Sequence, residues 1–193
     1  MSVLGLVPIG SPDEEVTVAL ETGLPEVFGL PVARLLPLPE PVRALDTSRG
    51  QWASTEFLRL LIGSVPPGTK RVLGLTPRDL FVPVLSFVFG QAQLNGPVAV
   101  VSLARLEQGF HGLPDDRSVT AARALKEAVH ELGHTFGLVH CTDRTCPMSL
   151  SIDIRQLDAK TARFCSTCAI LLKESPGMRN ESRKPASAVW RQP

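Results

Sequence analysis

Three histidines and one glutamate within residues 130–140 have the types and the spacing of a catalytic zinc site. His130 and His134 are four residues apart, so on a helix they project from one face and can bind the same ion. Gly137 permits a backbone conformation that ends the helix and lets the chain return His140 as a third ligand. A fourth position then stays open for water, and we expect Glu131 to take the proton of that water as general base.

A His-Glu-x-x-His pair alone would also fit two solvated histidines on a helix. Residues 130–140 carry the longer pattern His-Glu-x-x-His-x-x-Gly-x-x-His, in which five positions coincide. Such a coincidence is rare at ordinary residue frequencies, and the pattern is a signature of zinc proteases. We therefore predict that the three histidines of this pattern bind a catalytic zinc ion.

The four cysteines of the chain fall into two close-spaced pairs. Cys141 directly follows His140, Cys146 comes after four further residues, and Cys165 and Cys168 form a Cys-x-x-Cys pair. Two such pairs can supply four thiolates to a closed, tetrahedral zinc site. Disulfides, a redox pair and an iron–sulfur centre are the alternatives, but nothing in the chain points to an oxidising compartment. We predict a structural zinc ion, which would also anchor the loop that carries the third histidine.

The string H-E-x-x-H-x-x-G-x-x-H-C-x-x-x-x-C-x-M, followed by C-x-x-C, resembles the archaemetzincin family of zinc metalloproteases. The resemblance is strongest over residues 121–168, and residues 87–106 also resemble the stretch before the family's active-site helix. It implies a zinc-dependent peptidase with a second, structural zinc on the four cysteines. Met148 stands where the metzincin clan places its Met-turn. We expect its side chain to form an apolar floor beneath the imidazoles, the alternative being an ordinary core methionine.

Length and composition exclude several classes of protein. With 193 residues, 44% of them apolar, and a formal charge of +1, the chain fits one domain with a sizeable core. It lacks the basic surface that nucleic-acid binding needs, including binding by a four-cysteine zinc ribbon. No apolar run approaches the ~20 residues of a membrane-spanning helix. Residues 1–9 lack the flanks of a secretory signal, so we expect a cytoplasmic protein. The sequence indicates no particular oligomeric state.

Short apolar runs alternate along the chain with stretches in which apolar residues recur every three to four positions. The short runs predict strands, and the periodic stretches predict helices. We expect strands at residues 3–8, 32–36, 71–76, 85–91 and 97–103. We expect helices from a capping box at residues 11–14 to Gly23, at residues 53–62, at residues 118–136, and at residues 159–172 with Asp158 as cap. The stripe of the third helix should be Ala122, Leu125, Val129, Leu132 and Phe136. A turn at Asn95-Gly96 makes the last two strands antiparallel neighbours.

These elements predict an α/β fold with a mixed, mostly parallel sheet of about five strands, backing helices and an active-site helix. This matches the metzincin fold that the resemblance implies. We expect one catalytic domain over residues 1–173, with subdomains of about 1–137 and 138–173, and a polar, flexible tail at 174–193. A partner-binding segment is the alternative for the tail. By analogy with the clan, residues 85–91 should form the antiparallel edge strand above the cleft, where a peptide substrate could add as a further strand.

Two functions remain open at this point. The first is a zinc peptidase, either an aminopeptidase or a peptidase for short peptides. The second is a catalytically weak or silent zinc-binding protein of the same fold that serves as a binding module. The intact Glu131 favours the enzyme. The chain has no tyrosine, so stabilisation of an oxyanion must come from zinc, backbone amides or another donor. His111, in the loop before the active-site helix, fits a solvated histidine better than a substrate contact.

Overall fold

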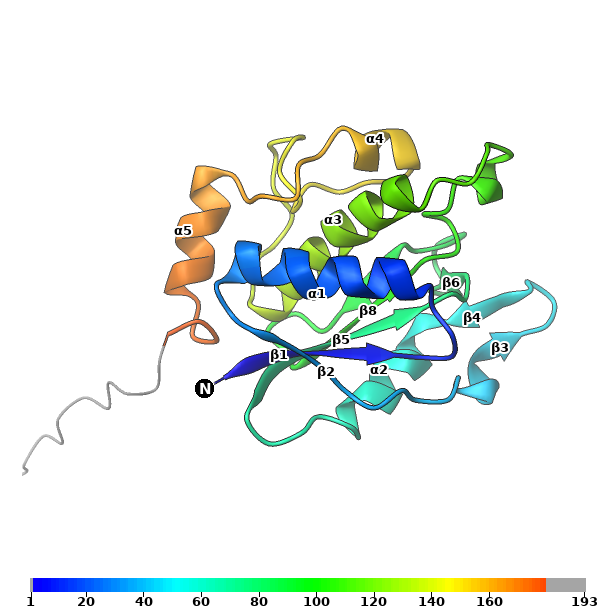
Figure 1. Cartoon of the computed structure of the whole chain (residues 1–193), viewed down its shortest axis with the longest axis horizontal. Coiled ribbons are helices and arrows are strands. Elements are labelled where there is room, and N and C mark those ends of the chain that lie inside the picture. Colours follow the sequence, from blue (N-terminus) through cyan, green and yellow to red (C-terminus); the bar gives the residue numbers. More distant parts are fainter. Residues whose placement is uncertain (1, 180–193) are drawn as a thin grey trace, which may run out of the picture.

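Five strands form one mixed sheet in the order β2-β1-β5-β8-β7 (Figure 1). The structure is a computed structural model and describes residues 2–179. The strands of this sheet are β1 Val3–Pro8, β2 Val32–Arg34, β5 Thr69–Thr76, β7 Gly90–Ala92 and β8 Val98–Ser102. The first four in the order run parallel, and β7 is antiparallel to β8 at the edge. The predicted sheet and its antiparallel edge strand are thus confirmed.

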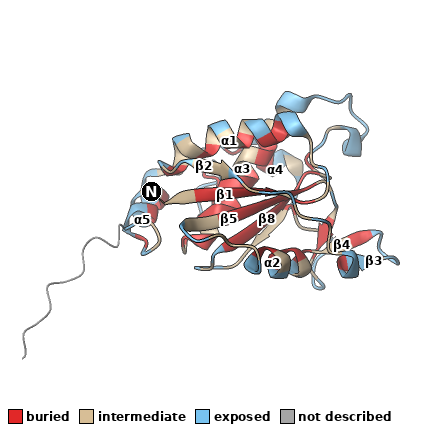
Figure 2. Ribbon diagram, turned by 60° about the horizontal axis from the view of Figure 1, so that its bottom comes forward, coloured by how far each residue is buried: buried red, intermediate tan, exposed pale blue. Residues whose placement is uncertain are grey.

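Helices cover both faces of the sheet, as Figure 2 shows by the buried residues gathered between them. The helices are α1 Glu14–Phe28, α2 Ser54–Ile62, α3 Arg117–Thr135, α4 Ile154–Asp158 and α5 Ser166–Glu174, with short 3-10 turns at Val42–Ala44 and Gly109–His111. One core cluster joins α1 and α3 to one face of the sheet, and a second joins α2 to the other. Strands buried on both faces must be continuously apolar, which is why the sequence identifies them.

A second, three-stranded sheet was not predicted. It consists of β3 Leu45–Asp46, β4 Gln51–Ala53 and β6 Leu80–Phe81, in the order β3-β4-β6. These strands are only two or three residues long, too short to show a hydrophobic period. The predicted edge strand at 85–91 also begins late, because residues 85–89 form a loop before β7.

Helix α1 differs from its prediction at both ends. Its cap is Asp13, whose carboxylate accepts hydrogen bonds from the backbone N–H of the next helical turn, so the capping box at residues 11–14 was wrong. The helix also runs through Gly23 and ends where Gly29 adopts a left-handed φ of 64°. Gly23 has a packing role, since a Cβ there would lie 2.8 Å from Leu125 on α3. The glycine allows α1 and α3 to lie close together.

The core face of α3 is only partly the predicted stripe. Val129, Leu132 and Phe136 are buried as expected, but Ala122 is exposed, and the first half of the helix buries Ala124 and Ala128. These small side chains belong to the core cluster that joins α3 to α1 and to the sheet.

The predicted helix at residues 159–172 is present only in its second half, as α5, and its predicted start and cap were wrong. Asp158 ends α4 and does not cap a helix, because its carboxylate accepts two hydrogen bonds from Arg123 on α3, at 2.7 and 2.8 Å. The chain then crosses a loop that is held to the preceding segment by a bond from Thr161 N–H to Thr145 O, 2.8 Å long. Helix α5 starts after Cys165, so Cys168 lies on the helix and Cys165 precedes it.

The predicted subdomains share one core. Leu138, Met148 and Leu172 belong to the same buried cluster as the sheet strands β1, β5 and β8. The predicted tail begins at the last residue of α5, and its residues 180–193 lie outside the described residues. Within the described part of the chain, no helix is long and apolar enough to cross a membrane.

Replacing Arg123 by alanine should lower the free energy of unfolding by about 1–3 kcal/mol, because Leu106 O and Asp158 lose buried donors. The lower half of this range applies if water resolvates Asp158, whose side chain is 45% exposed. Arg117→Ala, which removes an exposed cation paired with Glu15 on the surface, should change it by less than about 1 kcal/mol. Urea unfolding of both variants beside the parent measures the difference.

The same pair predicts a pH dependence. The hydrogen bonds of Arg123 lower the pKa of Asp158. A lowered folded-state pKa contributes stability above the ordinary carboxyl pKa of about 3.9, and this contribution is lost as the pH falls through the lowered value. The difference in unfolding free energy between the parent and Arg123→Ala should therefore narrow in acid, down to the part that the bond to Leu106 O contributes. A gap that stays constant down to the lowest pH would contradict this.

Candidate metal centres

The last two turns of α3 and the chain just after it bring three imidazoles together. His130 and His134 lie on α3, His140 follows in the next loop, and one ring nitrogen of each lies within 4.8 Å of the others. His130 is buried, whereas His140 is exposed. The rings of His130 and His134 are nearly perpendicular, with Nε2 atoms only 3.0 Å apart.

Backbone carbonyls determine which ring nitrogens carry protons. Nδ1 of His130 lies 2.7 Å from Pro147 O, and Nδ1 of His134 lies 2.8 Å from Leu138 O. A carbonyl oxygen only accepts, so both Nδ1 atoms donate. Burial lowers the pKa of both rings, that of His130 to about 3, so both are neutral near pH 7. Two unprotonated Nε2 atoms then face one another, which is unfavourable without a cation between them and fits a divalent metal.

A left-handed glycine turns the chain after α3. Gly137 has φ 94°, and its N–H and that of Leu138 donate to the carbonyls of His134 and Gly133. A side chain at Gly137 would also collide with Asn95. The expected turn is therefore present, and it places Leu138 O where it accepts from the His134 ring.

Met148 is fully buried and packs against α3 at Gly133, which lies between His130 and His134 on the helix. Any Cβ at Gly133 would overlap the Met148 sulfur, so the glycine is what lets the methionine approach the helix. The turn that contains Met148, called the methionine turn below, is also bound to the segment that carries His140, since Cys141 N–H donates to Met148 O at 3.0 Å. Sequence reasoning missed Gly133, although a glycine inside a helix is a recognised sign of close packing.

The four cysteines also come together. Their sulfur atoms lie within 4.8 Å of one another, all four are free thiols, and Cys146 and Cys168 are buried. Burial raises the pKa of the Cys146 and Cys168 thiols, whereas a backbone N–H at the start of α5 lowers that of Cys165. Four sulfurs in a closed cluster are the donor set of structural zinc sites. The histidine and cysteine groups thus fit two separate metal sites.

The three histidines line a cavity of about 450 Å³. Strand β7 and the loop before it contribute to its lining, as do residues 150–152 after the methionine turn. Leu85, Leu150 and Ile152 are large apolar side chains that line it and are more than half exposed. The cavity therefore has polar ligating groups in a mostly apolar surround, as enzyme sites commonly do.

Glu131 points into this cavity from α3 and is 5% exposed. It packs against the edge strand, where a Cβ at Gly90 would lie 2.7 Å from its Cγ. Burial, followed by the charge of Glu127, raises the pKa of Glu131. Among residues 2–179, no group donates a hydrogen bond to its carboxylate. The carboxylate is thus free to accept one from a molecule in the cavity.

Two further charged residues of the cavity were not predicted. Glu127 lies one turn before Glu131 and is buried, and burial raises its pKa to about 7. Lys160 reaches the cavity from the loop after α4, and burial lowers its pKa. The four-residue spacing of the glutamates was a usable signal for Glu127. Nothing in the local sequence marks Lys160.

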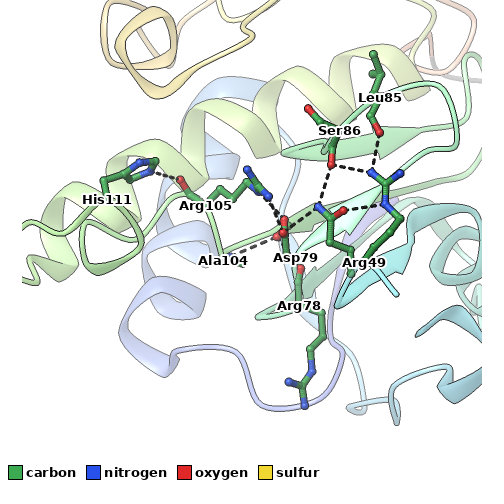
Figure 3. A network of polar contacts seen from close by, with 10 residues as sticks. Arg49, Arg78, Asp79, Leu85, Ser86, Ala104, Arg105 and His111 are labelled. Atoms are coloured by element: carbon green, nitrogen blue, oxygen red, sulfur yellow. Dashed lines mark hydrogen bonds and ion pairs between the residues drawn. The ribbon is translucent and has the colours of Figure 1, made fainter. Parts of the chain in front are cut away.

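A polar network holds the loop at the cavity rim (Figure 3). Asp79 accepts two hydrogen bonds from Arg105, at 2.7 and 2.8 Å, and one from Gln51 at 2.9 Å. Arg49 donates to the carbonyls of residues 85 and 86 at 3.0 and 2.9 Å, and Gln51 also donates to the second of these. The rim loop is therefore fixed through its backbone, which leaves its side chains free to face the cavity.

His111 is exposed in the 3-10 turn Gly109–His111. Its Nε2 lies 2.9 Å from the carbonyl oxygen of Arg105 (Figure 3). It is not among the residues that line the cavity. This agrees with a solvated loop histidine.

Comparison with known proteins gives a consistent result. The model of peptidase family M54 matches residues 68–174. The archaemetzincin of Methanocaldococcus jannaschii is 42% identical over 86% of this chain and 90% of its own length. That of Haloarcula marismortui is 36% identical over 84% and 95%, respectively.

Solved structures of archaemetzincins share the fold. The crystal structure from Methanopyrus kandleri has a TM-score of 0.79 and 38% identity, covering 90% of this chain and 94% of that one. The structure from Archaeoglobus fulgidus, complexed with malonate, has a TM-score of 0.76 and 33% identity, covering 89% and 99%. The chain therefore belongs to peptidase family M54, the archaemetzincins, and is a zinc metallopeptidase.

Proposed function

We propose that the chain hydrolyses peptide bonds in the cavity, with His130, His134 and His140 as zinc ligands and Glu131 as general base. The observation that supports this most is the 3.0 Å approach of two Nε2 atoms whose rings each turn Nδ1 to a backbone carbonyl. When bound, zinc with an open coordination position supplies Lewis-acid chemistry, because it lowers the pKa of a water and polarises a carbonyl. A merely buried histidine pair would place one N–H opposite one lone pair.

Glu131 is placed to move the proton. Its carboxylate lies in the cavity beside the first histidine and accepts no hydrogen bond from residues 2–179. It can therefore accept the proton of an attacking water and pass it to the leaving amine. Packing against Gly90 limits the positions that its side chain can take, which favours a fixed direction of proton transfer.

Strand β7 offers a binding edge for the peptide. It pairs with β8 on one side, and within residues 2–179 no strand pairs with its other side. An extended substrate could add there through backbone hydrogen bonds, with the scissile carbonyl over the histidines. Such binding depends little on substrate sequence, so side-chain preference would come from the rim.

The four cysteines hold the second, structural zinc in this proposal. Cys141 is the neighbour of His140, and its N–H binds the methionine turn. A metal tie between Cys141, Cys146 and the start of α5 would hold both segments against the core. A cytoplasmic location fits these free thiols, because a reducing compartment preserves them. The single catalytic domain at residues 1–173 remains part of the proposal.

Glu131→Gln should keep the fold and both zinc ions but lower kcat for peptide hydrolysis by about 10²- to 10⁴-fold, because the base is removed and no ligand is lost. Glu26→Gln, an exposed glutamate on α1, is the matched control and should keep full activity. Peptide cleavage followed by mass spectrometry, with zinc measured on the same samples, tests both. Undiminished cleavage in the Glu131 variant would exclude it as the base, and a chain that never cleaves peptides would support the binding module.

The two zinc ions should differ in lability. The histidine site keeps an open position, whereas the cysteine site is closed and rich in thiolate. Graded exposure to a mild chelator should therefore remove one ion first and abolish hydrolysis while the second ion stays. Zinc analysis at each step follows this, and simultaneous loss of both ions would contradict the assignment.

Cys165→Ser should remove the structural ion and destabilise the C-terminal segment. Zinc binding contributes on the order of 10 kcal/mol to the folding of small zinc domains, so even a fraction of this is a large loss here. The histidine site should also bind zinc less tightly, because Cys141 loses its tether. Thr167→Ser, between the two cysteines, is the control. Thermal melting and metal content of each variant test this prediction. An unchanged melting temperature with full zinc would mean that the cysteines do not bind a structural ion.

A further inference from the structure

Lys160 lies where a lysine side chain is costly, since it is only 4% exposed. Its Nζ donates to Pro147 O at 3.2 Å and also to Ser149 O. These two carbonyls belong to the residues directly before and directly after Met148. The side chain thus binds the methionine turn at both of these residues, although it comes from a loop that follows the turn by more than ten residues.

The carbonyl of Pro147 has two donors. It accepts from Nδ1 of His130 at 2.7 Å and from Nζ of Lys160 at 3.2 Å, and its two lone pairs allow both bonds. The direction of this carbonyl decides where the His130 ring points, and therefore where its Nε2 lies. Partners of this kind behind a metal-binding histidine commonly control the orientation and basicity of the ring. Lys160 is thus connected to His130 through a single backbone oxygen.

Lys160 is also the counter-charge of the cavity. Glu127 and Glu131 both line it, and of the described residues that line it Lys160 alone is a lysine or arginine. Both carboxylates favour the charged form of Lys160, against the burial that disfavours it. A neutral residue here would leave two buried carboxylates without a cation, apart from the metal.

We propose that Lys160 is a positioning residue of the catalytic site, which orients His130 through the carbonyl of Pro147 and holds the Met148 turn through that of Ser149. This inference rests on the proposed function, because His130 acts there as a zinc ligand. The sequence pattern of the site, which runs from His130 to Met148, does not include this lysine.

Lys126 provides a matched control. Its Nζ also donates to two carbonyls of the C-terminal segment, Leu157 O at 3.3 Å and Asp158 O at 2.9 Å. It lies on α3, as do His130 and His134, but it does not line the cavity. Lys126→Met therefore removes the same kind of contact, a lysine bound to two backbone carbonyls of the chain after α3, without touching the carbonyls next to Met148.

The experiment compares Lys160→Met, Lys160→Arg and Lys126→Met with the parent, all with zinc at the cysteines. Zinc affinity of the histidine site is measured by competition with a chelator, and cobalt(II) placed in that site reports its geometry by visible absorption. We expect Lys160→Met to bind zinc about 10- to 100-fold more weakly and to shift the cobalt spectrum. Its kcat should fall by a similar factor while KM stays within about twofold.

The two other variants separate positioning from general stability. Lys160→Arg should recover part of the affinity, because a guanidinium can also donate to both carbonyls. Lys126→Met should lower the melting temperature and leave the affinity and the cobalt spectrum unchanged. If Lys160→Met fails to fold, Lys160→Gln, which keeps N–H donors without the charge, is measured by the same readouts.

Parent-like zinc affinity and cobalt spectrum in the Lys160 variants would overturn the inference, even if kcat fell, because Lys160 would then act on the substrate and not through His130. Equal shifts in Lys126→Met would overturn it as well, because the effect would be one of general stability. A parent that binds no metal at its histidines would instead remove the proposed function, and the role of Lys160 with it. The two failures are therefore distinguishable.

Discussion

Two backbone carbonyls decide what the histidines of this protein can do. Pro147 O and Leu138 O accept the Nδ1 protons of His130 and His134, so both Nε2 lone pairs converge. Neither carbonyl belongs to α3, the helix that carries the rings. Both come from the irregular chain after it, and the geometry of the site is therefore only as stable as the path of residues 136–150. The left-handed turn at Gly137 and the buried methionine turn exist to define that path.

The chain after α3 has little regular structure of its own. Between α3 and α5 it contains only the five-residue helix α4, so hydrogen-bond ladders hold little of it in place. Side-chain contacts hold this part of the chain instead. Arg123 and Lys126 bind α4, and Lys160 binds the methionine turn. The four cysteine sulfurs gather at the start of α5. A metal bound by these sulfurs would add a crosslink where the core is small. The cysteine cluster and the histidine cluster thus depend on the same segment.

The cavity lies between two walls, one that is held rigidly by the sheet and one that carries the titratable side chains. Its rigid wall is strand β7 with the loop before it, fixed to the sheet and to the network around Asp79. Its active wall is α3, which presents two glutamates and two histidines on one side and core residues on the other. Gly90 lies where β7 approaches α3, and Gly133 lies where the methionine turn approaches it. A Cβ at Gly90 would meet Glu131, and one at Gly133 would meet Met148. The small residues therefore set how narrow the site can be.

The sequence by itself determined the family, the sheet and which residues are candidate ligands, because these signals are local: continuous apolar runs mark buried strands, and the spacing of histidines on a helix follows its period. Its errors have non-local causes. Gly23 did not end α1 because it packs against Leu125, and Asp158 did not cap a helix because Arg123 binds it. Only the tertiary structure brought Lys160 to the cavity, since a buried charge is placed by partners that are distant in the chain.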